Sequence, residues 1–179
     1  MKILTISGPP RSGKDLFCQA VCNKRGYVYN YSTIDEVKKL ARYLGWNGEK
    51  DEAGRKFLSD LKDAMTAYND LPRKYVIQQI EKQIEKINKE SNLILEDTIF
   101  LIQSREPEDI KRWVKENNAK SLCIYRYDLL KTWGNHADDD VTKYNYDYYL
   151  HNNSTIEDWE TKSLNFIDEI RYKDWESHI

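Results

Sequence analysis

Residues 8–14 read GPPRSGK, a glycine- and proline-rich turn that neither a helix nor a strand can continue through. Residues 2–7 before the turn alternate and are rich in β-formers, which predicts a short buried strand. Apolar residues at positions 16, 17, 20 and 21 after it predict a helix that begins at Lys14 and ends near Gly26. A strand, a GxxxxGK turn and a helix in this order indicate a phosphate-binding loop.

The chemistry of this loop depends on its glycines and its lysine. Gly8 and Gly13 let the backbone curl, so that successive N–H groups point at phosphate oxygens, and Lys14 can reach the β and γ phosphates of a nucleotide. The predicted contacts with the nucleotide run along the whole loop and into the helix: Gly8, Pro9, Pro10, Arg11, Ser12, Gly13, Lys14, Asp15 and Leu16. Within this set Arg11 can face solvent as readily as it can cap the phosphates.

Asp15 departs from the usual motif, which has at this position a Ser or Thr that ligates Mg²⁺. A carboxylate is a good oxygen ligand for Mg²⁺, so we predict Asp15 as part of the metal site. Its negative charge also lies close to the phosphates, which opposes their binding. The alternative is that Asp15 only provides a favourable negative charge in the first turn of the helix.

The rest of the chain alternates strands with helices. Further strands are expected at 27–31, 98–103, 120–125 and 146–150. Helices are expected from a cap at Ser32 to Gly45, twice within 51–90, at 107–117 and at 155–170. This order predicts a three-layer α/β/α fold of the P-loop NTPase type, with a mainly parallel five-stranded sheet.

The composition excludes several other classes of protein. Lys and Arg number 28 and Asp and Glu 30, so the net charge is −2 and no global positive excess is available for nucleic acid. No apolar run approaches the roughly 18 residues of a membrane span. Three cysteines without CxxC spacing and three scattered histidines argue against a disulfide scaffold and a zinc site. We expect a cytoplasmic protein with no membrane or nucleic-acid partner, and the sequence does not indicate its oligomeric state.

Four segments in the same order resemble the phage-type deoxynucleoside monophosphate kinases: residues 8–15, 55–58, 105–107 and 147–152. Those enzymes belong to the adenylate-kinase-like P-loop kinases, whose more distant members include dephospho-CoA kinase and animal phosphomevalonate kinase. An aspartate after the GK pair is itself a feature of this group. The middle segment of this chain is shorter than in the phage enzymes, and residues 71–96 have no counterpart there.

The resemblance implies transfer of a phosphoryl group from ATP, with Mg²⁺, to a small phosphorylated acceptor, for which a (deoxy)nucleoside monophosphate is preferred. The expected organisation is one kinase-like domain over 1–179, with a helical acceptor-binding insert at about 46–92 and a short lid at about 127–143. One alternative keeps the fold and makes dephospho-CoA or another phosphometabolite the acceptor. A second alternative is a nucleotide-binding regulatory module with little turnover, which Asp15 and the ending of the strand at 98–103 on Gln103 and Ser104, without an acid, favour.

Arginines and carboxylates complete the predicted site. By resemblance, Arg55 grips the monophosphate of the acceptor, unless it is only a solvated helix charge. Arg105 follows the central strand, at the sheet edge where α/β proteins bind ligands, and there holds the acceptor or the transferring phosphate, or else pairs with Glu106.

Arg126 ends the next strand and is predicted beside the donor phosphates or the adenine. By resemblance to dephospho-CoA kinase-like enzymes, the acid near the phosphates is Asp35, unless Asp35 is only a first-turn helix residue; Asp97 and Asp15 are the alternatives. The catalytic set is therefore Lys14, Arg105, Asp35 and Arg126, and the acceptor set is Arg55, Arg105 and Ser32. Trp46 and the tyrosines at 27, 29 and 31 are interpreted as core residues rather than as stacking partners of a base.

Overall fold

The structure is a computed structural model that describes residues 1–89, 94–126, 140–173 and 175. Five strands form one sheet in the order β2 (Val28–Ser32), β3 (Ile99–Gln103), β1 (Lys2–Ser7), β4 (Lys120–Tyr125) and β5 (Tyr148–His151). All four neighbouring pairs are parallel. The carboxyl ends of all five strands therefore lie along one edge of the sheet, where open α/β folds bind ligands.

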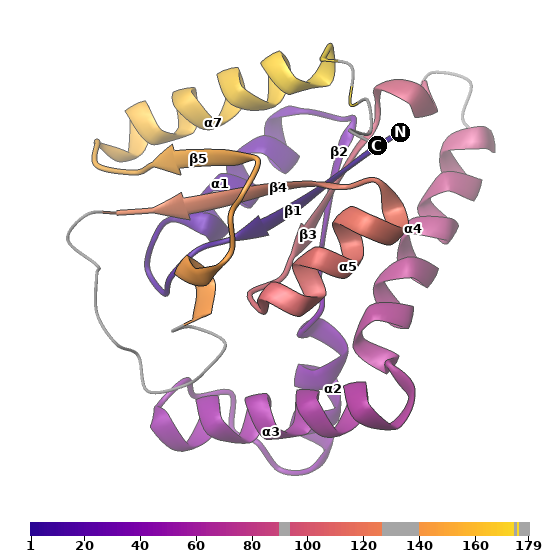
Figure 1. Ribbon diagram of the computed structural model, residues 1–179, viewed down its shortest axis with the longest axis vertical. Helices are drawn as coiled ribbons and strands as arrows, with labels where there is room; N and C mark the ends of the chain where they lie inside the picture. The colour runs from indigo at the N-terminus through magenta and orange to yellow at the C-terminus, as the bar shows by residue number, and fades with distance from the viewer. Residues whose placement is uncertain (90–93, 127–139, 174, 176–179) are drawn as a thin grey trace.

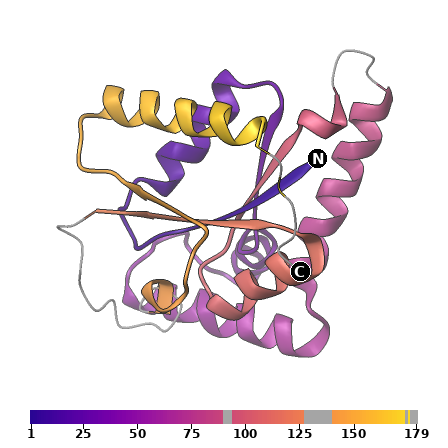
Figure 2. The same ribbon diagram turned by 45° about the horizontal axis from the view of Figure 1, so that its top comes forward.

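Helices cover both faces of the sheet, which confirms the predicted three layers (Figures 1 and 2). α1 (Lys14–Lys24) and α7 (Ile156–Arg171) lie on one face, where Phe17 and Trp159 pack against Leu4 and Leu101. α4 (Leu71–Lys89) and α5 (Pro107–Asn117) lie on the other. There, Val76, Ile80 and Trp113 pack against Phe100 and Ile102. The β3 residues Ile99 to Ile102 are fully buried between the two layers, as expected for a central strand.

Two further helices, α2 (Asp35–Tyr43) and α3 (Glu52–Asn69), lie beyond the sheet at the bottom of Figure 1. They pack on one another through Val37 and Ala41 of α2 and Leu58 and Met65 of α3. Short 3₁₀ turns occur at Leu95–Asp97 and Asp140–Lys143. The predicted lid at 127–143 lies outside the described residues except for the second of these turns. None of the described helices is long and apolar enough to cross a membrane.

Local signals explain where three of the described helices begin. Asp51 caps α3 by accepting a hydrogen bond from the Gly54 amide at 2.7 Å, Pro107 opens α5, and Thr155 caps α7 through the Asp158 amide. The predicted cap of α2 is wrong. Ser32 is the last residue of β2, because its pairing with Gln103 prolongs the strand, and α2 begins at Asp35 without a side-chain cap.

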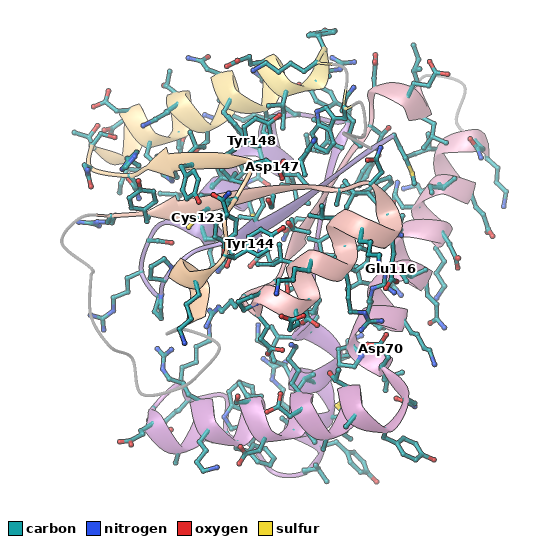
Figure 3. All side chains as sticks on the ribbon, viewed as in Figure 1. Asp70, Glu116, Cys123, Tyr144, Asp147 and Tyr148 are labelled. Atoms are coloured by element: carbon teal, nitrogen blue, oxygen red, sulfur yellow. The ribbon has the colours of Figure 1, made fainter. Side chains whose placement is uncertain are left out.

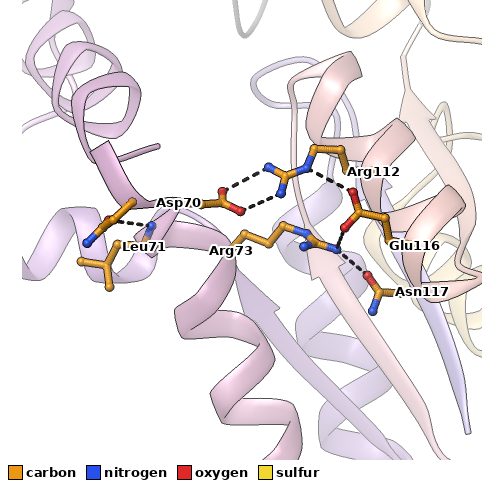
Figure 4. Close-up of polar contacts among 7 residues, drawn as sticks. Asp70, Leu71, Arg73, Arg112, Glu116 and Asn117 are labelled. Carbon is orange, nitrogen blue, oxygen red and sulfur yellow. Dashed lines mark hydrogen bonds and ion pairs between the residues drawn. The ribbon is translucent and has the colours of Figure 1, made fainter. Parts of the chain in front are cut away.

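The corner between α3 and α4 is fixed to α5 by a charged brace of Asp70, Arg73, Arg112 and Glu116 (Figure 4). Arg112 donates two hydrogen bonds to the Asp70 carboxylate, at 3.1 and 2.7 Å, and Arg73 lies 2.8 Å from Glu116. Asp70 itself adopts the left-handed conformation that ends α3. The brace holds α3 in a defined position relative to the sheet, which matters because α3 carries Arg55.

The edge strand β5 is held to β4 by hydrogen bonds at its start, between Asp147 and Ser121. The carboxylate of Asp147, which is labelled in Figure 3, accepts hydrogen bonds from the Ser121 amide and hydroxyl, at 2.8 and 2.7 Å. Among the described strands β5 pairs only with β4, so the Asp147–Ser121 hydrogen bonds add to the few backbone hydrogen bonds that hold it in the sheet. The end of β5 leads directly to Asn152, which contacts the glycine-rich loop.

Candidate active site

The loop between β1 and α1 is packed so tightly that two positions require glycine. Gly13 has a φ of +93°, and a Cβ there would lie 2.1 Å from Asn152 Nδ2. A Cβ on Gly8 would lie 2.2 Å from the carbonyl oxygen of Ile124. Neither clash can be relieved cheaply, since one partner is backbone and the other is anchored by a hydrogen bond.

Two side chains from the far end of the sequence hold the loop in shape. Asn152 Nδ2 donates to the Ser12 carbonyl at 3.0 Å, and Trp159 Nε1 donates to the Gly13 carbonyl at 3.3 Å. The sequence offered Asn152 only as part of a resembling segment and gave no sign of Trp159, because both lie about 140 residues away. Both bonds are accepted by loop carbonyls and use no loop amide, although the Ser12 amide itself donates to the Pro9 carbonyl at 3.2 Å.

The interior of the loop fits the phosphates of a nucleotide. Ser12 Oγ is buried and makes no hydrogen bond to any residue that the structure describes. The side chain of Lys14 is 8% exposed, and its ammonium lies 3.3 Å from Asp15 Oδ1. Burial, together with the charge of Arg105, lowers the pKa of Lys14. A phosphate oxygen supplies what these groups lack: an acceptor for the Ser12 hydroxyl and a counter-charge for Lys14.

Asp15 points outward from the first turn of α1, and its side chain is 79% exposed. Partial burial raises its pKa, but the charges of Lys14, Lys50 and Arg105 outweigh that effect, and the pKa is below its ordinary value. The carboxylate is therefore ionised at neutral pH and open to solvent. Among the described residues no group of three His, Cys, Asp or Glu side chains could hold a metal ion. Mg²⁺ commonly uses one or two carboxylates together with substrate phosphates and water, and a single exposed carboxylate such as that of Asp15 fits this pattern.

A cavity of about 430 Å³ opens beside Lys14 at the carboxyl edge of the sheet. Six residues predicted for the site line it, from α1, β2, α2, α3 and the β3–α5 connection: Lys14, Asp15, Ser32, Asp35, Arg55 and Arg105. The structure thus brings together residues that are up to 91 positions apart in the sequence. The other eight predicted residues do not line it. Seven belong to the loop and the start of α1: Gly8, Pro9, Pro10, Arg11, Ser12, Gly13 and Leu16. Arg11 among them is exposed, with a φ of 66°, and the eighth, Arg126, lies just after β4.

The cavity has a marked excess of positive charge, although the chain as a whole is slightly negative. Its basic lining residues are Lys14, Lys38, Lys50, Arg55, Lys62 and Arg105, and its acidic ones are Asp15, Asp35 and Glu106. Six cations against three carboxylates favour an anionic ligand.

No aromatic side chain lines the cavity in the described part of the chain. Tyr29 and Tyr31 stack on Phe100, and Trp46 packs with the α2–α3 cluster, as their interpretation as core residues predicts.

The alternatives for the acid separate by position. Asp35 lines the cavity from the first turn of α2, with its Oδ1 3.9 Å from the Lys38 ammonium. Asp97 precedes β3, at the amino edge of the sheet, and pairs with Arg171 at 2.9 Å. Since β3 crosses the whole sheet between Asp97 and the phosphate loop, Asp97 does not contribute to the site. The predicted alternatives for the acid are then Asp35 and Asp15.

Lys62 is a buried cation at the wall of the cavity that sequence reasoning missed. Its ammonium lies 2.6 Å from Glu106 and 2.7 Å from Asp109, which joins α3 to the start of α5. Burial lowers its pKa, but the two carboxylates outweigh burial, so the pKa is above its ordinary value. Glu106, which the sequence offered as an alternative partner of Arg105, thus forms an ion pair with Lys62. One sequence signal existed: Lys62 follows Leu58 by four residues and precedes Met65 by three, on the buried face of α3.

Replacing Lys62 by Met should lower the free energy of unfolding by about 2–3 kcal/mol, because the Glu106 and Asp109 carboxylates are left facing one another without a cation. This loss is somewhat smaller than for a fully buried ion pair. Because the pKa of Lys62 is raised above the ordinary 10.5, its ion pairs stabilise the fold fully below pH 10.5. This stabilisation is lost only as the pH rises through the raised pKa. The deficit measured by urea unfolding should therefore be equal at pH 7 and pH 9. Lys56→Met is the control, since its pair with Asp60 on the outside of α3 is exposed and should matter little. A deficit that vanishes at pH 9 would contradict the assignment.

Comparisons with known proteins give likenesses of structure only. No family model and no curated protein matches the chain. A dephospho-CoA kinase from Campylobacter jejuni is similar at 16% identity and a TM-score of 0.47, with 94% of this chain and 97% of that chain covered. A shikimate kinase from Bacteroides thetaiotaomicron is similar at 12% identity and a TM-score of 0.42, with 93% and 98% covered. An APS kinase mutant from Mycobacterium tuberculosis is similar at 12% identity and a TM-score of 0.40, with 93% and 96% covered.

The finer resemblance to phage-type deoxynucleoside monophosphate kinases stays a prediction. The structure itself supports a coarser statement, which concerns the fold alone. An all-parallel sheet of five strands, with β1 between β3 and β4, leads through a GxxxxGK loop into α1. By its strand order, its phosphate loop and its helical layers, the chain has a three-layer α/β fold of the P-loop type.

Proposed function

We propose that the protein is a small-molecule kinase that transfers a phosphoryl group from ATP to a small phosphorylated acceptor. One observation carries this proposal: Lys14 of the phosphate loop opens into the same cationic cavity as Arg55 and Arg105. A loop alone would support nucleotide binding, whereas a second anion site beside it supports transfer to a second substrate.

The proposed roles follow from position. The loop amides, the Ser12 hydroxyl and Lys14 bind the donor phosphates, and Asp15 is the residue that would hold Mg²⁺, which neutralises phosphate charge when bound. Arg55 and Arg105 bind the acceptor and orient it toward the loop. In such transfers the protein contributes mainly positioning and neutralisation of charge, for which a low-dielectric cavity rich in guanidinium groups is suited.

The preferred acceptor is a (deoxy)nucleoside monophosphate, whose attacking oxygen belongs to a phosphate that two arginines can hold. That oxygen is already anionic at neutral pH, so Asp35 has no proton to remove from it. If the acceptor instead offers a hydroxyl, as dephospho-CoA does, Asp35 is the cavity carboxylate that can accept its proton. The two acceptor classes therefore assign different roles to Asp35.

The test is ADP release measured with ATP, Mg²⁺ and a panel of acceptors: the four deoxynucleoside monophosphates, the four ribonucleoside monophosphates, dephospho-CoA and a blank. Release that depends on a nucleoside monophosphate supports the preferred acceptor, and release with dephospho-CoA alone supports the runner-up. Binding of an ATP analogue without turnover on any acceptor contradicts the kinase and supports a regulatory nucleotide-binding module.

Asp15 is predicted to contribute to the Mg²⁺ site, which gives opposite expectations for two substitutions. Asp15→Ser restores the usual hydroxyl ligand and should keep most activity. Asp15→Ala leaves the ion one ligand short and should reduce activity, with partial recovery at high Mg²⁺. Activity measured against Mg²⁺ concentration distinguishes them. An Asp15→Ala variant with normal activity and an unchanged Mg²⁺ requirement would show that Asp15 is only a helix-start charge.

A further inference from the structure

The cavity has two chemically different ends. The basic residues gather where α2, α3 and the β3–α5 connection meet the phosphate loop. The remaining wall, between α1 and the sheet edge formed by β2 and β3, carries uncharged polar groups and thiols: Cys18, Gln19, Cys22, Asn30 and Gln103. A phosphate needs only the basic end. A cavity of about 430 Å³ lies within the ~300–1,000 Å³ range of pockets that enclose whole small molecules.

An amide pair on neighbouring strands dominates this uncharged end. Gln103 Nε2 donates a hydrogen bond to Asn30 Oδ1 at 3.2 Å. Once that bond is made, the Asn30 amide still has donors to offer and the Gln103 amide still has an acceptor. The pair thus presents a donor and an acceptor next to each other at the cavity wall.

The backbone holds this pair in place. Asn30 pairs with Leu101 in the β2–β3 ladder, and Ser32 pairs with Gln103. The Thr33 amide and hydroxyl both donate to the Gln103 carbonyl, each at 3.3 Å. These bonds fix the backbones of the two residues relative to each other, and the hydrogen bond between their side chains is exposed, so a ligand in the cavity can reach it.

The thiols keep this end neutral. Cys18 is buried and Cys22 half-buried, one turn apart on α1. Burial raises the pKa of Cys22 to about 11 and raises that of Cys18 further, so neither is a thiolate at neutral pH. The uncharged end therefore offers hydrogen bonds and apolar sulfur surface, and it offers no charge to a second anionic group.

We propose that the uncharged end of the cavity binds the part of the acceptor that lies away from its phosphate, and that the Asn30–Gln103 amide pair recognises an uncharged group with adjacent hydrogen-bond donors and acceptors. The ligand class is a phosphomonoester whose other end is neutral and polar. A nucleobase edge and a set of sugar hydroxyls share this chemistry. The inference rests on the proposed acceptor site, and it adds the residues that select among phosphorylated acceptors.

The experiment measures direct binding by calorimetry, without ATP, for three kinds of probe: nucleoside monophosphates, ribose 5-phosphate and inorganic phosphate. The variants are Asn30→Leu and Gln103→Met, which keep the shape of each side chain and remove its polar atoms. In the native protein at least one nucleotide or sugar phosphate should bind more than tenfold more tightly than inorganic phosphate. Each variant should lose about three- to tenfold for that ligand, as expected for one or two neutral hydrogen bonds. Affinity for inorganic phosphate should change less than twofold.

The probes distinguish the two sources of the neutral group. A preference shown by ribose 5-phosphate indicates sugar hydroxyls, and a preference shown only by nucleotides indicates a base. Gln78→Met on the exposed side of α4, away from the cavity, is the matched control and should change no affinity.

Equal losses for inorganic phosphate and for the larger ligands would overturn the inference, because the variants would then act on the cavity as a whole. Variants that keep the full preference would overturn it as well. A failure of the proposed kinase activity is a separate result. If ADP release never depends on an acceptor while the binding pattern is as expected, phosphoryl transfer is refuted and the recognition site is still supported.

Discussion

Lys14→Ala is expected to lower kcat for acceptor-dependent ADP release by at least two to three powers of ten, the loss typical of removing one preorganised charge donor from a transition state. It should also weaken binding of ATP. The Lys14 ammonium is buried at the mouth of the phosphate loop and pairs with the Asp15 carboxylate at 3.3 Å. No other loop side chain can replace it, since Ser12 is uncharged and Arg11 points to solvent.

The stability of this variant separates a functional loss from unfolding. Burial lowers the pKa of Lys14 below its ordinary 10.5, which means that charging the folded protein at pH 7 costs free energy. That cost shrinks as the pH rises through the lowered pKa. Removing the ammonium should therefore leave the Tm at pH 7 unchanged or slightly higher.

The control for this prediction lies on the same helix. Lys24→Ala, at the other end of α1, removes an exposed pair with Glu160 and should leave both activity and ATP binding intact. Acceptor-dependent ADP production in Lys14→Ala at the native rate would refute the phosphate-loop assignment itself, since that assignment requires the Lys14 charge at the donor phosphates.

The elements that the sequence predicted well are those with signals inside their own segment. The strand at 2–7, the helix that opens at Pro107 and the strand at 120–125 all appear with the expected bounds. Ser32 shows the limit of such signals. It has the residue type of a helix cap, but β2 continues through it because Gln103 of a distant strand completes the ladder. Long-range pairing thus overrides a local preference.

The candidate site shows the same division. Arg105 could be placed because parallel strands bring their carboxyl ends to one edge, and Arg55 through its resemblance; the structure brings both to one cavity. Lys62 and Trp159 could not be placed, since their partners at Glu106 and Gly13 are 44 and 146 residues away. A lysine in an amphipathic helix and a tryptophan in a closing helix look like ordinary surface and core residues until the fold pairs them.

Replacing Arg55 or Arg105 by Met is expected to raise the acceptor KM, or lower kcat/KM, by about 10- to 150-fold, because a charge-assisted hydrogen bond contributes about 1.5–3 kcal/mol. Methionine keeps the apolar stem and removes the planar fork that binds a phosphate through two bonds. The two arginines reach the cavity from different elements. Arg55 comes from α3, where its Nε donates to the Lys50 carbonyl at 2.9 Å, and Arg105 follows β3.

These origins predict how the defect divides between the substrates. Neither residue belongs to the loop, so titration of an ATP analogue without acceptor should show nearly native affinity for Arg55→Met. Arg105→Met should show a small change at most, although the charge of Arg105 contributes to the lowered pKa of Lys14. Arg42→Met is the matched control, since Arg42 of α2 lies over the ring of Trp46 and does not line the cavity.

Each opposite result has a definite meaning. Loss of ATP binding with intact acceptor kinetics in both variants would reverse the proposed division of the site, and the cationic cavity would then belong to the donor. Native values for every parameter would make both arginines surface charges. In that case the excess of positive charge in the cavity would need another anion to explain it, and the binding of monophosphates would have to be ascribed to the four lysines of the wall.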